Sequence, residues 1–234
     1  MNMSDFQNIH EGKTAIMLGS GPSLRDFDSE KWNDNFITFG INSSIAKVPN
    51  CDYFVSDDNG ILFWTYYKEY IVSSKCMKFL YSKKLKKYAR QIPESNKIFY
   101  DHYDWDPKHK SYIQLTEDPN MPIIAARTSL ASAMHIAYIM GIRNFLLFGV
   151  DCSVEDNKRY FWEFKDQPSV KPIIKEITSA KYLGSADSHF AEFYQYWEAF
   201  EEYNKDKITV HDCSNGLLDM FDKMSTDNAI KKFG

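Results

Sequence analysis

Short apolar runs recur along this chain, and none of them alternates strictly between apolar and polar residues. They are TAIMLG at 14–19, FITFGI at 36–41, DYFVS at 52–56, MKFLY at 77–81, KIFY at 97–100, FLLFGV at 145–150 and ITVHD at 208–212. Strands buried on both faces have this character, which is typical of a parallel sheet covered by helices. The sequence therefore predicts an α/β fold built on a mostly parallel sheet.

Two other segments have helical character. Residues 129–142 (SLASAMHIAYIMGI) carry small and apolar residues at helical spacing and end near Gly141, which predicts a buried helix. Residues 189–204 are rich in aromatic residues and glutamates, which indicates an amphipathic helix against the sheet. Residues 101–125 and 153–188 hold prolines and charges but little periodicity, so we expect two irregular, lid-like segments within one domain of residues 1–234.

The composition argues against several classes of protein. No stretch approaches the roughly 18 unbroken apolar residues that a membrane span needs, and the start, MNMSDFQNIHEGK, does not resemble a secretory signal, so we expect a cytoplasmic protein. The scattered single cysteines predict free, mostly buried thiols. A net charge of −4 argues against a surface built wholly for nucleic acid, although a local patch could still bind it. The basic run at 83–90 is either a solvated helix face or a patch for phosphate or an acidic polymer.

Small residues follow the first apolar run, where the predicted strand gives way to a predicted helix. They are Gly19, Ser20, Gly21, Pro22 and Ser23. Backbone N–H groups and a helix dipole in this arrangement can face an anion. Leu24 replaces the third glycine of the dinucleotide fingerprint, and no G-K-S or G-K-T follows. The loop is therefore either a phosphate-binding loop of its own kind or a tight turn capped by Ser23.

Polar residues also follow three other predicted strands. They are Gly40 and Asn42, Asp57 and Asp58, and Gly149 and Asp151. The carboxyl ends of parallel strands meet at one edge of a sheet, where open α/β sheets bind their ligands, so these loops predict a nucleotide-sized site. Asp57 and Asp58 could hold Mg²⁺ or Mn²⁺ beside phosphates, because hard cations prefer carboxylate oxygens. The alternative is that both aspartates only cap the next helix.

Several strings in this chain resemble those of a known family. GSGPSL at 19–24, FGINSS at 39–44, ARTSLASAMHIAYIMG at 126–141, FGVD at 148–151, KYLGSADSH at 181–189 and VHDCSNGLLDMF at 210–221 resemble segments of bacterial sialyltransferases that decorate lipooligosaccharide. Related strings occur in the MptE-like (DUF115) group, which includes 6-hydroxymethylpterin diphosphokinases. The resemblance implies a Rossmann-like fold of the GT-A type that binds a nucleotide and transfers a group from it.

The resemblance also implies roles for particular residues. Gly19, Ser20, Gly21 and Asn42 would line the nucleotide pocket, which holds CMP in the sialyltransferases. Asp57 stands where those enzymes have an asparagine, which favours a metal-assisted relative or a different nucleotide.

On the same resemblance, Arg127 and Ser129 would face the donor. Tyr160 matches a tyrosine that assists the departing phosphate, whereas the partner tyrosine of that residue is replaced here by Ser153.

The catalytic base is the clearest departure from the family. Ser185 stands where the sialyltransferases have their catalytic histidine, and the nearest imidazole in the sequence is His189. His189 beside Asp187 could take the proton of an acceptor hydroxyl, because an imidazole titrates near neutral pH; the alternative is an ordinary surface or capping histidine. His135, inside the apolar helix, is predicted to be a core histidine. The remaining histidines, His10, His102, His109 and His211, show no spacing typical of a metal site.

These observations favour a glycosyltransferase that moves a sugar from a nucleotide-sugar donor of the CMP or UDP type to a hydroxyl on a glycan or small molecule. The first alternative is a diphosphokinase that uses ATP and Mg²⁺ on a hydroxymethyl acceptor. The second is a nucleotide-binding module without catalysis. The oligomeric state cannot be inferred from the sequence.

Overall fold

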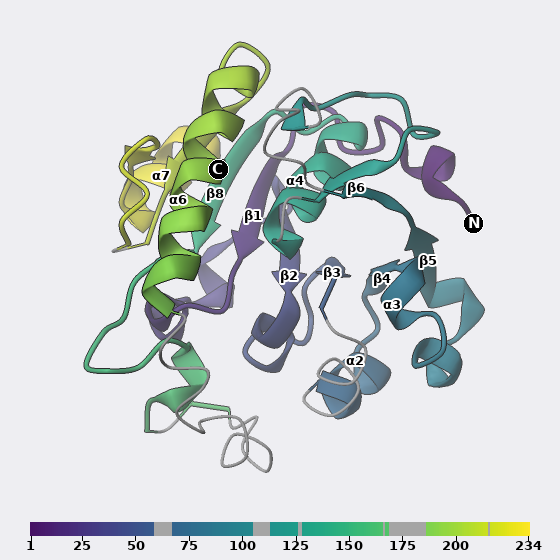
Figure 1. The fold of residues 1–234 in the computed structure, drawn as a ribbon, viewed down its shortest axis with the longest axis horizontal. Helices are drawn as coiled ribbons and strands as arrows, with labels where there is room; N and C mark the ends of the chain where they lie inside the picture. The colour runs from purple at the N-terminus through teal and green to yellow at the C-terminus, as the bar shows by residue number, and fades with distance from the viewer. Residues whose placement is uncertain (59–66, 105–112, 126–127, 166, 169–185, 215) are drawn as a thin grey trace.

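An eight-stranded sheet forms the centre of the molecule, with strand order β10-β9-β8-β1-β2-β3-β4-β5 (Figure 1). The computed structural model describes residues 1–58, 67–104, 113–125, 128–165, 167–168, 186–214 and 216–234. The strands are β1 (Thr14–Leu18), β2 (Phe36–Ile41), β3 (Tyr53–Ser56), β4 (Met77–Tyr81), β5 (Lys97–Tyr100), β8 (Asn144–Phe148), β9 (Thr209–Asp212) and β10 (Asp222–Lys223). Every pairing among them is parallel. The prediction of an α/β fold with a mostly parallel sheet is confirmed.

Both faces of this sheet are covered, which explains why its strands do not alternate in hydropathy. In β1, Ala15 and Met17 face one core cluster, whereas Ile16 and Leu18 face the other, and all four side chains are fully buried. Helices α4 (Ser129–Ile139) and α6 (Ala186–Asn204) pack on the first face (Figure 1). The second face is covered by shorter elements, namely η2 (Pro22–Asp26), η4 (Asn42–Ala46), α2 (Lys68–Ser73), α3 (Ser82–Leu85) and α7 (Thr226–Phe233).

The two predicted helices form close to their expected bounds. Every residue of α4 is buried, and the helix ends just before Gly141, whose φ of +94° is a left-handed conformation that favours glycine. His135, within α4, is a core histidine as predicted: its Nδ1 accepts from the amide of Ile124 at 2.9 Å and its Nε2 donates to the carbonyl of Thr116, also at 2.9 Å. Burial lowers the pKa of His135 to about 4.

Other expectations need correction. The helix predicted after the small-residue loop does begin, at Pro22, but it is the short 3-10 helix η2, and η3 (Ser29–Lys31) follows it. Residues 101–125 are not wholly irregular, since they include β6 (His102–Asp104) and β7 (Ile123–Ala125), which pair with each other in parallel. The basic run at 83–90 is not one helix face, because α3 ends at Leu85 and η6 covers Ala89–Gln91. Within the residues that the structure describes, the remaining short helices are η1 (Met3–Phe6), η7 (Glu94–Asn96) and η9 (Phe161–Glu163).

Two bulk predictions can be compared with the structure. All four cysteines are free thiols, and Cys51 and Cys76 are buried. In the parts of the chain that the structure describes, no helix combines the length and the apolar character needed to cross a membrane.

Candidate functional site at the carboxyl edge of the sheet

The strand order reverses direction next to β1. From β1 the chain adds β2, β3, β4 and β5 on one side, and then returns to add β8, β9 and β10 on the other. In open parallel sheets, such a reversal leaves a crevice at the carboxyl ends of the two central strands, and ligands bind there. The loops that follow β1 and β8 begin with Gly19 and Gly149, so the predicted site residues lie at this crevice.

The loop after β1 is bound tightly to the loop after β8. The amides of Gly19 and Gly21 donate to the carbonyl oxygens of Phe148 and Gly149, each at 2.7 Å. The amide of Ser23 donates to Oδ2 of Asp151 at 3.2 Å. These amides therefore already have partners within the protein. The N-terminus of η2, where we expected a phosphate, is occupied by the carboxylate of Asp151.

The same packing explains why this loop is built from small residues. A Cβ on Gly19 would lie 2.3 Å from the carbonyl oxygen of Gly149, and a Cβ on Gly21 would lie 2.1 Å from Oδ2 of Asp151. Gly149 has a φ of +65°, a conformation that glycine adopts readily. Burial raises the pKa of Asp151, and hydrogen bonding from Ser23 opposes that shift. The glycines thus have a structural function in joining the two loops.

A polar network lies on the other side of the crevice, at the ends of β2 and β3. Oδ1 of Asn42 accepts from the hydroxyl of Ser56 at 2.8 Å and from that of Ser129 at 3.4 Å. The amide of Asp57 donates to Oγ of Ser129 at 2.8 Å. Asn42 itself has a left-handed φ of +53°, which asparagine tolerates better than most residues. The structure thus brings together three predicted site residues, Asn42, Asp57 and Ser129, from two strand ends and the start of α4.

Asp57 is bound by partners that the sequence did not indicate. Its carboxylate accepts hydrogen bonds from Ser132 Oγ at 2.6 Å and from the hydroxyl of Tyr100. Burial raises the pKa of Asp57, whereas these two hydrogen bonds and the charges of His102 and Lys84 lower it. Both carboxylate oxygens are therefore already used to fix the side chain between β5 and α4.

This donor set does not fit the predicted magnesium or manganese site. Both oxygens of Asp57 are engaged by hydroxyl donors, and Oδ2 of Asp58 accepts from the hydroxyl of Tyr67 at 3.5 Å. Among the described residues, no group of three or more histidine, cysteine or acidic side chains is arranged to hold a metal ion. These contacts do not favour Asp57 and Asp58 as metal ligands, and that assignment stays a prediction.

Tyr160 is connected to the loops after β1 and β2 through contacts of its neighbours Phe161 and Trp162. Its ring is 41 % exposed and stacks on Trp162, with centroids 4.8 Å apart. The indole of Trp162 donates to Oγ of Ser43 at 3.2 Å, and the amide of Phe161 donates to the carbonyl of Ser20 at 3.2 Å. Trp162 was missed at the sequence level, because its contact to Ser43 joins segments 119 residues apart.

The remaining predicted residues are only partly covered. Arg127 lies outside the described residues. Asp187 and His189 belong to the first turn of α6, but their side chains are outside the described part of the chain. Their predicted roles stay predictions.

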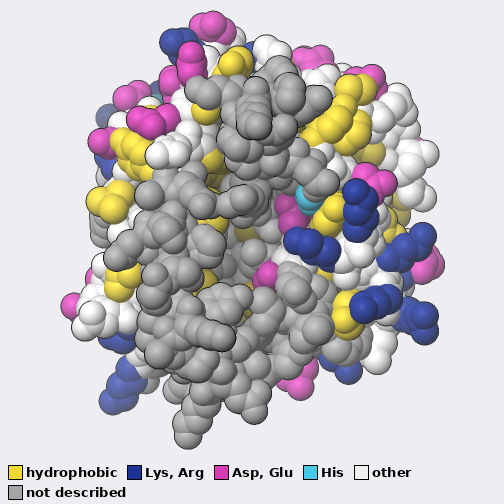
Figure 2. Space-filling view, in the orientation of Figure 1, with side chains coloured by type: hydrophobic (Ala, Val, Ile, Leu, Met, Phe, Trp, Pro, Cys, Tyr) yellow, Lys and Arg dark blue, Asp and Glu magenta, His cyan; other side chains and the backbone are white. Residues whose placement is uncertain are grey.

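Basic side chains gather beside this edge on the face shown in Figure 2, over the region of α3. The exposed residues there are Lys83, Lys84, Lys86, Lys87 and Arg90. Lys84 joins this patch to the polar network, since its Nζ donates to the carbonyl of Asp57 at 3.4 Å.

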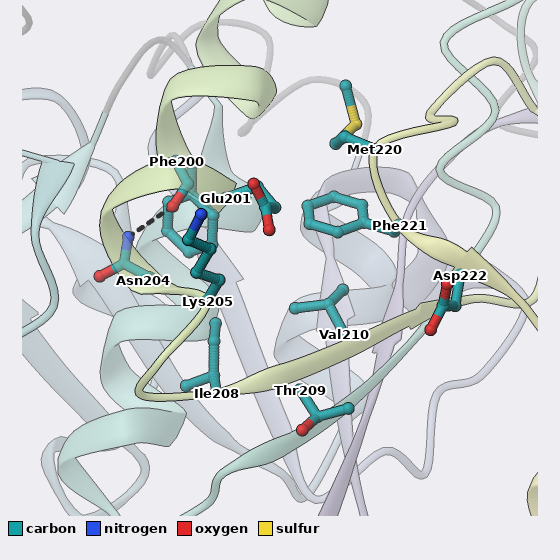
Figure 3. Close-up of a pocket in the computed structure, with 10 residues that line it drawn as sticks. All are labelled: Phe200, Glu201, Asn204, Lys205, Ile208, Thr209, Val210, Met220, Phe221 and Asp222. Carbon is teal, nitrogen blue, oxygen red and sulfur yellow. Dashed lines mark hydrogen bonds between the residues drawn. The ribbon is translucent and has the colours of Figure 1, made fainter.

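A cavity of about 250 Å³ lies elsewhere, between the end of α6 and the first residues of β9 and β10 (Figure 3). Phe200, Val210 and Phe221 form its apolar wall, and Glu201 and Lys205 line its polar side. Because it adjoins the amino end of β9, it is not part of the carboxyl-edge site.

The fold defines a doubly wound α/β protein whose polar loops follow the strands next to its topological reversal. No family model and no curated protein matches the sequence. Among solved structures, the fold is similar to the sialyltransferase CstII from Campylobacter jejuni in complex with the substrate analogue CMP-3FNeuAc, with a TM-score of 0.51 and 18 % identity over 92 % of this chain and 87 % of that one. A complex of the same sialyltransferase with CMP and a trisaccharide acceptor gives a TM-score of 0.50 at 17 % identity, over 91 % of this chain and 86 % of that one.

A second kind of similar structure is the MAf glycosyltransferase from Magnetospirillum magneticum AMB-1. The TM-score is 0.54 at 13 % identity, and the match covers 97 % of this chain. The chain spans only 38 % of the length of that protein. At these identities the similarity establishes the shared fold.

Proposed function

We propose that this protein is a glycosyltransferase that moves a sugar from a CMP- or UDP-type donor to a hydroxyl group of a glycan or small-molecule acceptor. The observation that carries the proposal is the network of Asn42, Ser129 and Asp57 at the reversal of a sheet whose fold is similar to that of a CMP-binding sialyltransferase. In this proposal, Ser20 and Asn42 bind the nucleotide, and Ser129 faces the donor.

The departing nucleotide carries negative charge, and its stabilisation is the main chemical task of such a site. We assign this task to the hydroxyl of Tyr160 and the guanidinium of Arg127. Stacking on Trp162, which is itself bonded to Ser43, would hold the ring of Tyr160 in one orientation. Since hydroxyl groups of the protein already bind both carboxylate oxygens of Asp57, we expect nucleotide binding that does not depend on a divalent cation.

A thermal-shift panel tests this proposal. The chain is heated with CMP, UDP, GDP or ATP, each with Mg²⁺, with Mn²⁺ or with EDTA. A nucleotide that binds only the folded state stabilises it by about 2.7 kcal/mol at a hundred times its Kd. We expect CMP or UDP to raise the Tm equally with metal and with EDTA. Stabilisation by ATP and Mg²⁺ alone would instead indicate a diphosphokinase, and binding without release of sugar from any donor would indicate a module without catalysis.

The variant Asn42→Gly tests the residue that carries the proposal. Glycine keeps the left-handed backbone but removes the Oδ1 that accepts from Ser56 and Ser129. We expect nucleotide affinity to fall at least about tenfold, since loss of one good hydrogen-bonding group costs on the order of 1–3 kcal/mol. Asn8→Gly is the matched control, because Asn8 also has a left-handed φ, of +59°, and is exposed beside the end of α4. Equal affinities of the two variants would contradict the assignment.

A further inference from the structure

The proposed transfer needs a group that takes the proton of the acceptor hydroxyl. Four histidines have side chains that the structure describes: His10, His102, His135 and His211. His135 is enclosed in the core, and His211 is buried against Lys232 and Phe233 of α7. The ring of His10 forms a hydrogen bond with the hydroxyl of Tyr53. Tyr53 is the first residue of β3, so His10 lies at the amino edge of the sheet. His102 differs from all three, because it is partly exposed and follows the carboxyl end of β5.

The ring of His102 is held by two contacts. It stacks on Tyr81 of β4, with centroids 3.7 Å apart and an angle of 29° between the rings. Its Nδ1 lies 3.0 Å from the carbonyl oxygen of Tyr103. A carbonyl oxygen can only accept, so Nδ1 must carry the hydrogen in this contact. In the neutral ring Nε2 then keeps its lone pair, and among the described residues no side chain or backbone group donates to it.

A chain of contacts connects His102 to the nucleotide side of the crevice. Tyr81 lies beside Tyr100, at 6.4 Å between ring centroids, and Tyr100 donates to the carboxylate of Asp57. The amide of Asp57 is bonded to Ser129, which in turn donates to Asn42. His102 therefore lies on the β4–β5 side of the same polar edge, where an acceptor can approach a donor bound at β1 and β2.

The charges around His102 come from several elements. Asp57, at the end of β3, attracts an imidazolium, and the charge of His102 in turn opposes the rise in the pKa of Asp57 that burial causes. Lys84 of α3 opposes it, because its ammonium lies over the ring of Tyr81, 5.7 Å from the centroid. Asp101, next in sequence, is bonded to the hydroxyl of Ser82. Asp57 and Asp101 thus supply two carboxylates near the ring, and Lys84 supplies one ammonium.

We propose that His102 is the general base of the transfer, receiving at Nε2 the proton of the acceptor hydroxyl. This inference rests on the proposed function. As the hydroxyl O–H bond breaks, the oxygen forms a bond to the anomeric carbon of the donor sugar. The bond from that carbon to the phosphate oxygen breaks, and its electron pair leaves with the nucleotide. The imidazolium then returns its proton to water. A positioned base contributes on the order of 10²- to 10⁴-fold in rate.

The tautomer of His102 can be tested without any substrate. Nitrogen-15 NMR of the full chain distinguishes a neutral ring with its hydrogen on Nδ1 from one with its hydrogen on Nε2. We expect the Nδ1–H form. A neutral ring that carries its hydrogen on Nε2 could not accept a proton there, and this result would overturn the proposal whatever the chain's activity.

Kinetics with CMP- and UDP-sugar donors and hydroxyl acceptors test the base itself. We expect His102→Ala to lower turnover at least about a hundredfold while nucleotide affinity changes less than about twofold, and added imidazole to restore part of the rate. The acidic limb of the wild-type pH profile should disappear in this variant. His10→Ala is the matched control and should retain the wild-type rate. Full activity of His102→Phe, which keeps the stacking on Tyr81 but has no base, would overturn the proposal, as would a loss confined to His189→Ala.

The two proposals can fail separately. Wild-type protein that binds no nucleotide in the thermal-shift panel would refute the proposed function and with it the base. Wild-type protein that transfers sugar, with His102→Ala as active as wild type, would refute only the base.

Discussion

Replacing Gly19 by alanine distinguishes a packing role of the small-residue loop from a ligand-binding role. The new Cβ would lie 2.3 Å from the carbonyl oxygen of Gly149 and 2.9 Å from its carbonyl carbon. Both atoms belong to the backbone, so no side-chain rotation relieves the contact. One of the two loops must move, although the amides of Gly19 and Gly21 bind the end of β8 at 2.7 Å.

The expected cost follows from this geometry. Overpacking by one methyl group against an immobile neighbour typically costs about 1–3 kcal/mol. For a chain of 234 residues, each kcal/mol corresponds to a fall in Tm of roughly 2–4 °C. We therefore expect Gly19→Ala to unfold roughly 2–12 °C below the wild-type protein.

The assay is thermal and urea unfolding, with nucleotide affinity measured on the same preparations. Gly12→Asn is the control, because Gly12 has a left-handed φ of +78° and nothing within 4 Å of a Cβ, and asparagine tolerates that backbone. We expect this control to stay within about 0.5 kcal/mol of wild type. If Gly19→Ala unfolds like wild type but binds nucleotide tenfold more weakly, the packing explanation is refuted. The loop would then be built from small residues so that the ligand can approach its backbone.

Three further expectations follow from the buried groups. Burial lowers the pKa of His135 from its ordinary 6.5 to about 4 in the folded state, so the unfolded chain binds more protons between these two pH values. The free energy of unfolding should therefore fall by about 2 kcal/mol between pH 7 and pH 5. In urea unfolding, His135→Gln should lose this pH dependence. Asp57→Asn should lower the free energy of unfolding by about 1–3 kcal/mol, because an amide nitrogen cannot accept a hydrogen bond, and a variant as stable as wild type would contradict the network. Burial raises the pKa of Cys152 and of Cys213 to about 12, although both residues are partly exposed. Because the thiolate is the reactive form, a thiol reagent at pH 8 should modify both on the order of 10³-fold more slowly than free cysteine.

The sheet could be predicted from the sequence because its signal is local. A strand such as β1 or β8 is buried on both faces, so nearly every residue in it is apolar. Helix α4 was equally clear, since Gly141 marks its end. Strand β10 has only two residues and β6 and β7 have three each, which is too few for any period to appear.

The site could be predicted only in part, for a related reason. The convergence of Asn42, Asp57 and Ser129 was foreseeable, because parallel strands end at one edge. Which partner occupies each polar atom was not foreseeable. Asp151 lies 128 residues from Ser23, and Ser132 lies 75 residues from Asp57. Such contacts depend on how the loops pack in three dimensions, and no local pattern encodes them.

The position of Asp151 limits where a nucleotide phosphate can bind. The carboxylate accepts from the amide of Ser23 at the start of η2, and a phosphate at the same place would bring two anions together in a buried setting. In the proposed function, the phosphates would therefore bind on the β2 side, where Asn42 follows β2 and the ring of Tyr160 is exposed. That arrangement leaves the β4–β5 side, with His102, for the acceptor, so donor and acceptor would approach each other across the end of β3.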